Sequence, residues 1–214
     1  MDVPLERIRH LRETSADTPL MVWSIQHRLA IDELERGQLV ASYHRVKHER
    51  LPATRWMADE MRRRGLELGT DDSPMWLFLE EPPLRNDAVW GNPPSHGADH
   101  RLLNLLIPLK RMLISYHWPW ANTFLHEFRP NPVRFYLSSS QVERESLGFP
   151  IPPEAECQRS WQRLFDLTLV DETGFSWEDS RSAGGPSPLS DFFRLQATVP
   201  CLLRSDLISV SNEW

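Results

Sequence analysis

The stretch Met21-Val22-Trp23-Ser24-Ile25-Gln26 is a short apolar run that ends on a polar amide. It lies between a proline turn and an amphipathic segment, a setting typical of a central β-strand. A second strand is predicted near the other end, in Phe193-Arg194-Leu195-Gln196-Ala197-Thr198-Val199. Side chains alternate along a strand, so the odd-numbered apolar residues of this run face one way and the polar ones, including Gln196, the other. In one compact domain, we expect the two strands to bring Gln26 and Gln196 into one cleft.

Composition places the chain among ordinary globular proteins. It has 214 residues, 40% hydrophobic and 25% charged, which suits one domain with a sizeable core. The 18 prolines against 9 glycines indicate many rigid loops, and the 9 tryptophans are most simply explained by core packing. The net charge of −6 argues against a general nucleic-acid coating protein.

The cysteines and the lengths of the apolar runs indicate the compartment and redox state of the protein. Cys157 and Cys201 are far apart and form no CxxC pattern, so neither a disulfide framework nor a zinc ribbon is expected. The N-terminal segment lacks the apolar core of a secretory signal, and no run approaches the roughly 20 apolar residues of a membrane span. We therefore expect a cytoplasmic protein without a membrane partner.

Hydrophobic periodicity and the positions of glycine and proline predict mixed short helices and strands. The expected helices cover residues 4–13, 27–36, 53–64, 118–128 and 154–166. The expected strands cover 20–26, 39–41, 75–79, 102–109, 111–115, 133–137, 192–199 and 207–210, with long loops at 82–100 and 171–188. Because no regular β-α-β rhythm is present, we predict an α+β fold. Residues 1–19 would form an N-terminal helix and linker, and residues 20–214 a single α+β domain with a mixed central sheet.

Several short segments, in order, resemble a bacterial domain-of-unknown-function family whose members open with a Trp-Thr-Ile-Gln-like strand. The matching pieces are Val22–Gln26, Leu34–Leu39, Arg55–Met57 with Met61 and Arg64, Pro74–Trp76, Pro83–Arg85, Met112–Ser115 before Trp120, Ser160–Asp166, Gln196–Thr198 and Asp206–Val210. The chain departs from the family pattern at two places. Tyr116 and His117 follow Ser115 where an acidic residue is usual, and Pro83–Arg85 lacks an expected aspartate. The family carries no settled activity, so the resemblance informs the fold more than the function.

The layout is also similar to that of ADP-ribosyltransferase-like folds. Those folds begin with a strand bearing a polar NAD-contacting residue, followed by a helix and a glycine turn, and place a polar residue on a late strand. Gln26, Gly37 and Gln196 occupy comparable places in this sequence. Many active transferases carry glutamate where this chain has Gln196, and an amide cannot supply the negative charge that stabilises an oxocarbenium-like centre.

These observations lead to one candidate constellation. Gln26 and Arg85 would position an NAD-like or other nucleotide cofactor, Trp76 or Trp120 would stack on its base, and Gln196 would act as the catalytic residue that orients the ribose or an acceptor. The alternative is structural. The glutamines would then form hydrogen bonds with backbone groups at the sheet edge, and Arg85 would hold its loop in place.

Metal and nucleophilic chemistry have weaker support. His44 and His48, like His96 and His100, have i, i+4 spacing, but neither pair carries the glutamate of an HExxH motif, and no metal is expected. No nucleophile elbow, Walker loop or GxGxxG motif is present.

Two functional hypotheses follow. The first is an NAD- or nucleotide-handling transferase of the ADP-ribosyltransferase type, acting on a protein or nucleic-acid acceptor. The second is a non-catalytic binding or accessory protein that uses a cleft lined by tryptophan and arginine to hold a nucleotide, a peptide or a partner subunit.

Overall fold

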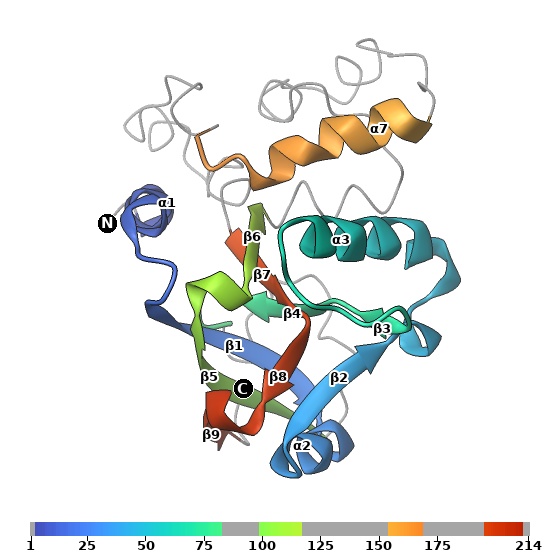
Figure 1. The fold of residues 1–214 in the computed structure, drawn as a ribbon. Helices are drawn as coiled ribbons and strands as arrows, with labels where there is room; N and C mark the ends of the chain where they lie inside the picture. The colour runs from blue at the N-terminus through green and yellow to red at the C-terminus, as the bar shows by residue number, and fades with distance from the viewer. Residues whose placement is uncertain (1–2, 83–98, 117–153, 169–194, 212–214) are drawn as a thin grey trace, which may run out of the picture. The chain divides into compact units, whose positions relative to one another are not determined.

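A computed structural model describes residues 3–82, 99–116, 154–168 and 195–211 (Figure 1). The chain divides into two compact units. One comprises Met1–Thr14 and Ile114–Leu195, and the other comprises Ser15–Leu113 and Gln196–Trp214. Short helices and antiparallel strands follow one another without a β-α-β rhythm, and this confirms the predicted α+β class.

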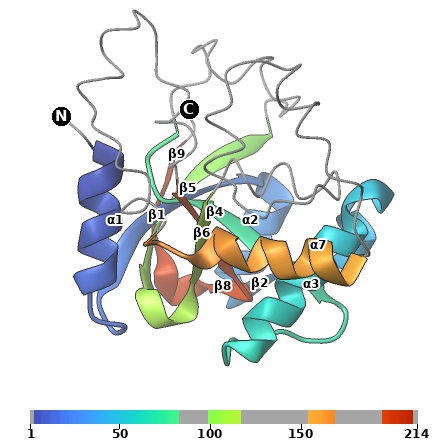
Figure 2. The same ribbon diagram turned by 90° about the horizontal axis from the view of Figure 1, so that it is seen from above.

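The larger unit is built on an antiparallel sheet whose strand order includes β7-β4-β1-β5-β9. These strands are β7 (Leu195–Val199), β4 (Met75–Phe78), β1 (Pro19–His27), β5 (His100–Pro108) and β9 (Leu207–Ser211). The longest pairing joins β1 to β5 over nine residue pairs, from Pro19 opposite Pro108 to His27 opposite His100. Figures 1 and 2 show these two strands lying side by side. The predicted opening strand is thus central to this sheet.

One face of the sheet forms an apolar core. Directly opposed residues of neighbouring strands lie on the same face, and Val22 opposes Leu105 while Ser24 opposes Leu103. All four are at most 1% exposed. Leu77 and its partner Ala197 add two more buried side chains from β4 and β7. The other face carries Trp23, which opposes Phe78 on β4 and Asn104 on β5.

A smaller sheet has the order β3-β2-β8, with β3 at Asp72–Ser73, β2 at Gln38–Ser42 and β8 at Cys201–Leu203. Helix α2 (Arg28–Glu35) leads into it and buries Ala30, Ile31 and Leu34. Gly37 ends the helix with φ +143°, a backbone conformation that side chains disfavour. The predicted helix stop at Gly37 is therefore confirmed.

Helix α3 (Leu51–Arg63) begins with proline in its first turn and ends before Gly65, whose φ is +79°. Trp56, Met57 and Met61 are buried and form an apolar stripe along the helix. The 3₁₀ turns η1 (Tyr43–Arg45) and η2 (His48–Arg50) connect β2 to this helix. Two further 3₁₀ turns, η4 (Leu109–Arg111) and η6 (Arg204–Asp206), lie at the end of β5 and before β9.

The smaller unit contains α1 (Val3–Glu13), most of β6 (Leu113–Tyr116), α7 (Glu154–Trp161) and η5 (Gln162–Phe165). Its buried apolar side chains among the described residues are Ile8, Leu11, Tyr116, Trp161, Leu164 and Leu195. The helix predicted over 154–166 is present as α7 followed by η5. The elements predicted over 118–128, 133–137 and 171–188 lie outside the described residues. None of the described helices combines the length and apolar character that a membrane crossing requires.

Candidate functional site

The two glutamines predicted to share a cleft lie in different surroundings. Gln26 is half-buried near the end of β1, and its Nε2 donates a hydrogen bond of 2.8 Å to the Oγ of Ser24. Gln196 is 5% exposed and lies on β7 opposite Phe78. Gln26 is therefore held by its own strand, whereas Gln196 is enclosed.

Strand register places these two side chains on opposite faces of the sheet. Gln196 opposes Phe78, and Phe78 opposes Trp23, so these three residues share one face. Gln26 is three residues beyond Trp23 on β1, an odd step that puts it on the other face. Strand β4 also lies between the two strands that carry the glutamines. The sheet does not bring Gln26 and Gln196 into one cleft.

The remaining predicted cofactor residues are divided as well. Trp76 opposes Thr198 on β7, so it shares a face with Gln196 and not with Gln26. Arg85 and Trp120 lie outside the described residues. Within the described part of the chain, the predicted NAD constellation is not assembled.

A cavity of about 410 Å³ lies elsewhere in the larger unit, beside α3. Three segments line it: η1, one face of α3, and the loop that precedes β3. The lining residues are Tyr43, His44, Leu51, Arg55, Asp59, Arg62, Thr70 and Asp71. We take this cavity as the candidate functional site because it combines ligand-sized volume with several convergent polar groups.

Helix periodicity explains why four of these residues come from α3. Leu51, Arg55, Asp59 and Arg62 are spaced four, four and three residues apart and therefore lie on one face. The residues buried in the core occupy a different stripe, at positions such as Ala53, Met57 and Met61. The helix thus packs with one face and lines the cavity with another.

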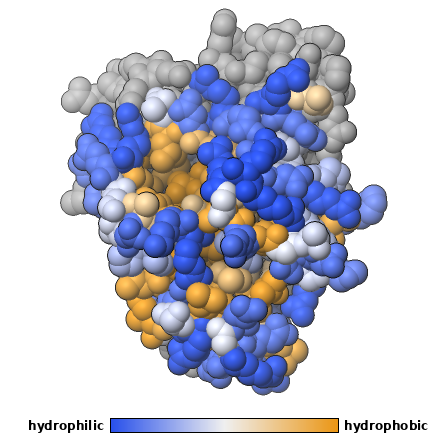
Figure 3. Space-filling model, viewed as in Figure 1, coloured by the Kyte–Doolittle hydropathy of each residue, from blue (hydrophilic) through white to orange (hydrophobic). Residues whose placement is uncertain are grey.

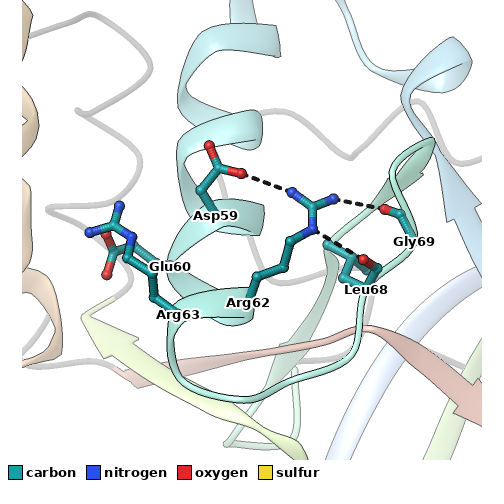
Figure 4. Close-up of polar contacts among 6 residues, drawn as sticks. All are labelled: Asp59, Glu60, Arg62, Arg63, Leu68 and Gly69. Atoms are coloured by element: carbon teal, nitrogen blue, oxygen red, sulfur yellow. Dashed lines mark hydrogen bonds and ion pairs between the residues drawn. The ribbon is translucent and has the colours of Figure 1, made fainter.

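Arg62 holds the loop before β3 against the helix (Figure 4). Its Nε donates to the carbonyl of Leu68 at 3.1 Å, and its Nη2 donates to that of Gly69 at 2.7 Å. Its Nη1 pairs with Asp59 at 2.8 Å. Three donors of this guanidinium are committed to the protein, so Arg62 builds the wall of the cavity and is a poor candidate for binding a ligand anion.

Arg55 is differently placed. Its guanidinium carbon lies 5.7 Å from the centre of the Tyr43 ring, a cation–π contact. Arg55 is exposed, and within the described residues it forms no ion pair. This guanidinium is therefore held in place by a ring while its charge stays available to a ligand.

Tyr43 and His44 enter the site from a 3₁₀ turn with defined supports. Ser42 caps η1, because its Oγ accepts a hydrogen bond of 3.3 Å from the backbone N–H of His44. The backbone N–H of Tyr43 donates to the carbonyl of Asp71 at 3.4 Å, which joins η1 to the third cavity segment. Burial raises the pKa of the Tyr43 phenol, and the charge of Arg62 partly opposes that rise. Tyr43 is thus a neutral hydrogen-bonding group at physiological pH.

The cavity is lined by as many positive as negative side chains, but not all of them are paired with each other. Arg55 and Arg62 are positive, and Asp59 and Asp71 are negative. Arg62 and Asp59 pair with each other, whereas Arg55 and Asp71 form no ion pair among the described residues. The site therefore offers a cation and a carboxylate to a ligand that carries both an anionic group and hydrogen-bond donors.

The predicted histidine pairs do not extend this site into a metal centre. His44 belongs to η1 and His48 to η2, which are separate turns, and His96 lies outside the described residues. The described residues contain no group of three or more histidine, cysteine, aspartate or glutamate side chains suited to a metal ion.

Of the residues that line this cavity, the sequence singled out only His44, in an i, i+4 histidine pair, and Arg55, in the family resemblance, and assigned neither of them to a common site. The only local signal was the polar face of the helix at 53–64, which most often means a solvated surface. Tyr43 and Asp71 approach that face because β2 pairs with β3 through Ala41 with Ser73 and Ser42 with Asp72. A strand of two residues, such as β3, is too short to show an alternating pattern in the sequence.

Comparisons with protein-family models, with curated proteins and with solved structures find no match to this chain.

Proposed function

We propose that this is a small-molecule-binding protein whose cavity beside α3 holds a nucleotide-class ligand. The observation that supports this most is the placement of Arg55, a guanidinium positioned over Tyr43 and unpaired within the described residues. Arginine is suited to phosphate because its planar donors match two phosphate oxygens at once.

The other lining groups fit the rest of such a ligand. Asp71 can accept hydrogen bonds from the amino group of a nucleobase, and Thr70 can bond with a ribose hydroxyl. The volume of about 410 Å³ falls within the range of roughly 300–1,000 Å³ for small-molecule pockets. This chemistry supports the binding-protein hypothesis, with arginine and tyrosine in the place expected for arginine and tryptophan.

The transferase hypothesis receives less support. It requires Gln26 and Gln196 to act on one ligand, and the strand register puts them on opposite faces. Gln196 is also nearly fully enclosed. For these reasons we favour binding without a group-transfer step.

The test is calorimetric titration with AMP, ADP, NAD and inorganic phosphate. Arg55→Gln should weaken nucleotide binding at least tenfold, because it removes the charge that meets the phosphate. Arg36→Gln is the matched control, since Arg36 is an exposed arginine at the end of α2 and lies outside the cavity lining. It should bind as the unmodified protein does.

A third variant separates the two hypotheses. Gln26→Ala should leave binding unchanged if the ligand occupies the cavity beside α3. Loss of NAD binding in Gln26→Ala with full binding in Arg55→Gln would overturn our proposal and favour the transferase layout. Absence of binding for every compound in the panel would overturn both.

A further inference from the structure

Positive charge is concentrated in the segment that connects β2 to α3. This basic segment, residues 44–50, contains Arg45, Lys47 and Arg50 against one acidic residue, Glu49, whereas the whole chain carries a net charge of −6. Arg45 and Lys47 are exposed, and neither forms an ion pair with another described residue. A local excess of cations on an acidic protein attracts a polyanion to that part of the surface.

The basic segment borders the cavity at both of its ends. His44 and Leu51 line the cavity, so the chain leaves the cavity wall at one residue and returns to it at the other. The 3₁₀ turns η1 and η2 make up most of this stretch, and the backbone N–H of Arg50 donates a hydrogen bond of 2.9 Å to the carbonyl of Lys47. These turns keep the cations of the segment beside the cavity.

The cavity is open to solvent. Five of its eight lining residues are exposed, namely His44, Arg55, Asp59, Thr70 and Asp71. In Figure 3 the hydrophilic colour covers most of the right-hand side, where Figure 1 places the connection between β2 and α3. A nucleotide bound in the cavity is therefore not sealed off, and its phosphate can continue into a neighbouring nucleotide.

The charges of the cavity lining match such a strand. Arg55 is one helical turn beyond Leu51, so it extends the line of cations from the basic segment into the cavity. Asp71, a carboxylate with no ion pair among the described residues, repels phosphate and accepts hydrogen bonds from a base. The phosphates are thereby directed to Arg55 and to the basic segment.

The contact between Tyr43 and Arg55 supplies the remaining feature of a single-strand site. It places an aromatic ring and a guanidinium plane together in the cavity wall, and a base can stack on either of them. Proteins that bind single strands combine stacking groups of this kind with cations that follow the backbone.

We propose that the cavity and the basic segment together bind single-stranded nucleic acid, with one nucleotide in the cavity and the phosphates of its neighbours along residues 44–50. A single strand fits better than a duplex, because only an unpaired base can leave the stack and enter a cavity. This inference rests on the proposed function, since it requires that the cavity hold a nucleotide.

Fluorescence anisotropy with a labelled eight-nucleotide adenine RNA, and with AMP as competitor, tests the proposal. The RNA should bind at least tenfold more tightly than AMP, because its additional phosphates meet Arg45 and Lys47. Arg45→Gln combined with Lys47→Gln should weaken RNA binding at least tenfold and leave AMP binding within twofold, since neither residue lines the cavity. Arg36→Gln combined with Arg204→Gln removes the same charge from exposed positions outside the cavity lining and should change neither affinity.

The salt dependence of RNA binding counts the phosphate contacts. Each phosphate neutralised on a single strand contributes about −0.7 to the slope of log affinity against log salt concentration. Contacts from Arg45, Lys47 and Arg55 therefore predict a slope of about −2 for the unmodified protein and of about −0.7 for the variant without Arg45 and Lys47.

Three results would overturn this inference while the proposed function stands. They are RNA binding no tighter than that of AMP, equal RNA binding by the double variant and its control, and RNA binding that saturating AMP does not displace. The third result would mean that residues 44–50 attract any polyanion without the cavity, and heparin would then bind as tightly as the RNA. If neither AMP nor RNA binds, the proposed function itself fails.

The sugar of the strand is identified by repeating the titration with DNA of the same sequence. Tighter binding of the RNA would assign the strand as RNA, and tighter binding of the DNA would assign it as DNA.

Discussion

Arg111 and Asp206 form a two-pronged ion pair between turns that are 95 residues apart in sequence. Nη1 lies 2.5 Å from Oδ1, and Nη2 lies 3.0 Å from Oδ2. Oδ2 of Asp206 also accepts a hydrogen bond of 2.8 Å from the backbone N–H of Leu203. The pair therefore joins the end of β5 to the turn that positions β8 and β9.

Removing the Asp206 carboxylate should strongly destabilise the fold. The Asp206 side chain is 4% exposed and that of Arg111 26%, so each charge depends on the other for compensation. Breaking one partner of a buried pair costs about 3–5 kcal/mol, and we expect a loss near the lower end for Asp206→Ala because Arg111 keeps some contact with water. Urea unfolding measures this loss of unfolding free energy in Asp206→Ala. Asp59→Ala, which breaks an exposed pair worth about 0.2–1 kcal/mol, is the control. Equal losses in the two variants would contradict this assignment.

Cys201 lies beside this pair, and its chemistry should reflect that position. Burial raises the pKa of the Cys201 thiol, while the nearby Arg111 charge opposes the rise. A raised pKa leaves less thiolate at neutral pH, and the thiolate is the reactive form. In a Cys157→Ser background, Cys201 should react with a thiol reagent more slowly than free cysteine does at pH 7, and the rate should continue to rise above pH 9. A rate equal to that of free cysteine at pH 7 would contradict the prediction.

Arg62 provides a test of how the cavity wall is built. Arg62→Ala removes two hydrogen bonds to the carbonyls of Leu68 and Gly69, and we expect a loss of about 1–3 kcal/mol because hydrogen bonds to charged groups are the stronger ones. Hydrogen exchange should show the larger effect at residues 66–72. Arg36→Ala is the control, since Arg36 is an exposed arginine at the end of α2 and lies outside the cavity lining. The role assigned to Arg62 is wrong if exchange in this loop does not change.

The parts of the fold that were predictable are those with a local signal. The strand at 20–26 follows from a short apolar run after a proline turn, and the buried stripe of Trp56, Met57 and Met61 follows from spacing close to the helical period. Both signals are contained in the sequence of the segment itself. Gly37 and Gly65 ended their helices as expected because positive φ is a property of single residues.

The site was not predictable because it depends on pairings between distant segments. Within the described strand Leu195–Val199 the alternation is as predicted, but which face Gln196 shares with β1 depends on the intervening strand β4 and on its register. A one-residue change in register would reverse that face. Tyr43, Arg55 and Asp71 likewise come together only through the short pairing of β2 with β3.

His27 caps α2, and this role has a clear signature. Its Nδ1 accepts a hydrogen bond of 3.2 Å from the backbone N–H of Leu29. Loss of an N-cap acceptor costs about 0.5–2 kcal/mol, so His27→Ala should lower the free energy of unfolding by about 1 kcal/mol. His27→Asn keeps an acceptor at the cap and should retain most of that stability. If both variants lose the same amount in urea unfolding, the ring contact of His27 with His100, at 5.2 Å between centroids, is the more important interaction.

Tyr43 should make the stability of the protein fall at high pH. Burial raises its pKa above the ordinary value of 10.0, so the folded state holds the proton more tightly than the unfolded state does. The stability that this proton contributes is fully present below about pH 10 and is lost as the pH rises through the folded-state pKa. Unfolding free energies of the unmodified protein and Tyr43→Phe should therefore run parallel up to pH 9, and above pH 10 the unmodified protein should decline more steeply. Ultraviolet difference absorbance between the two proteins isolates the phenolate of Tyr43, and its midpoint should lie above 10. A midpoint at or below 10 would mean that the ring is not desolvated by the wall of the cavity.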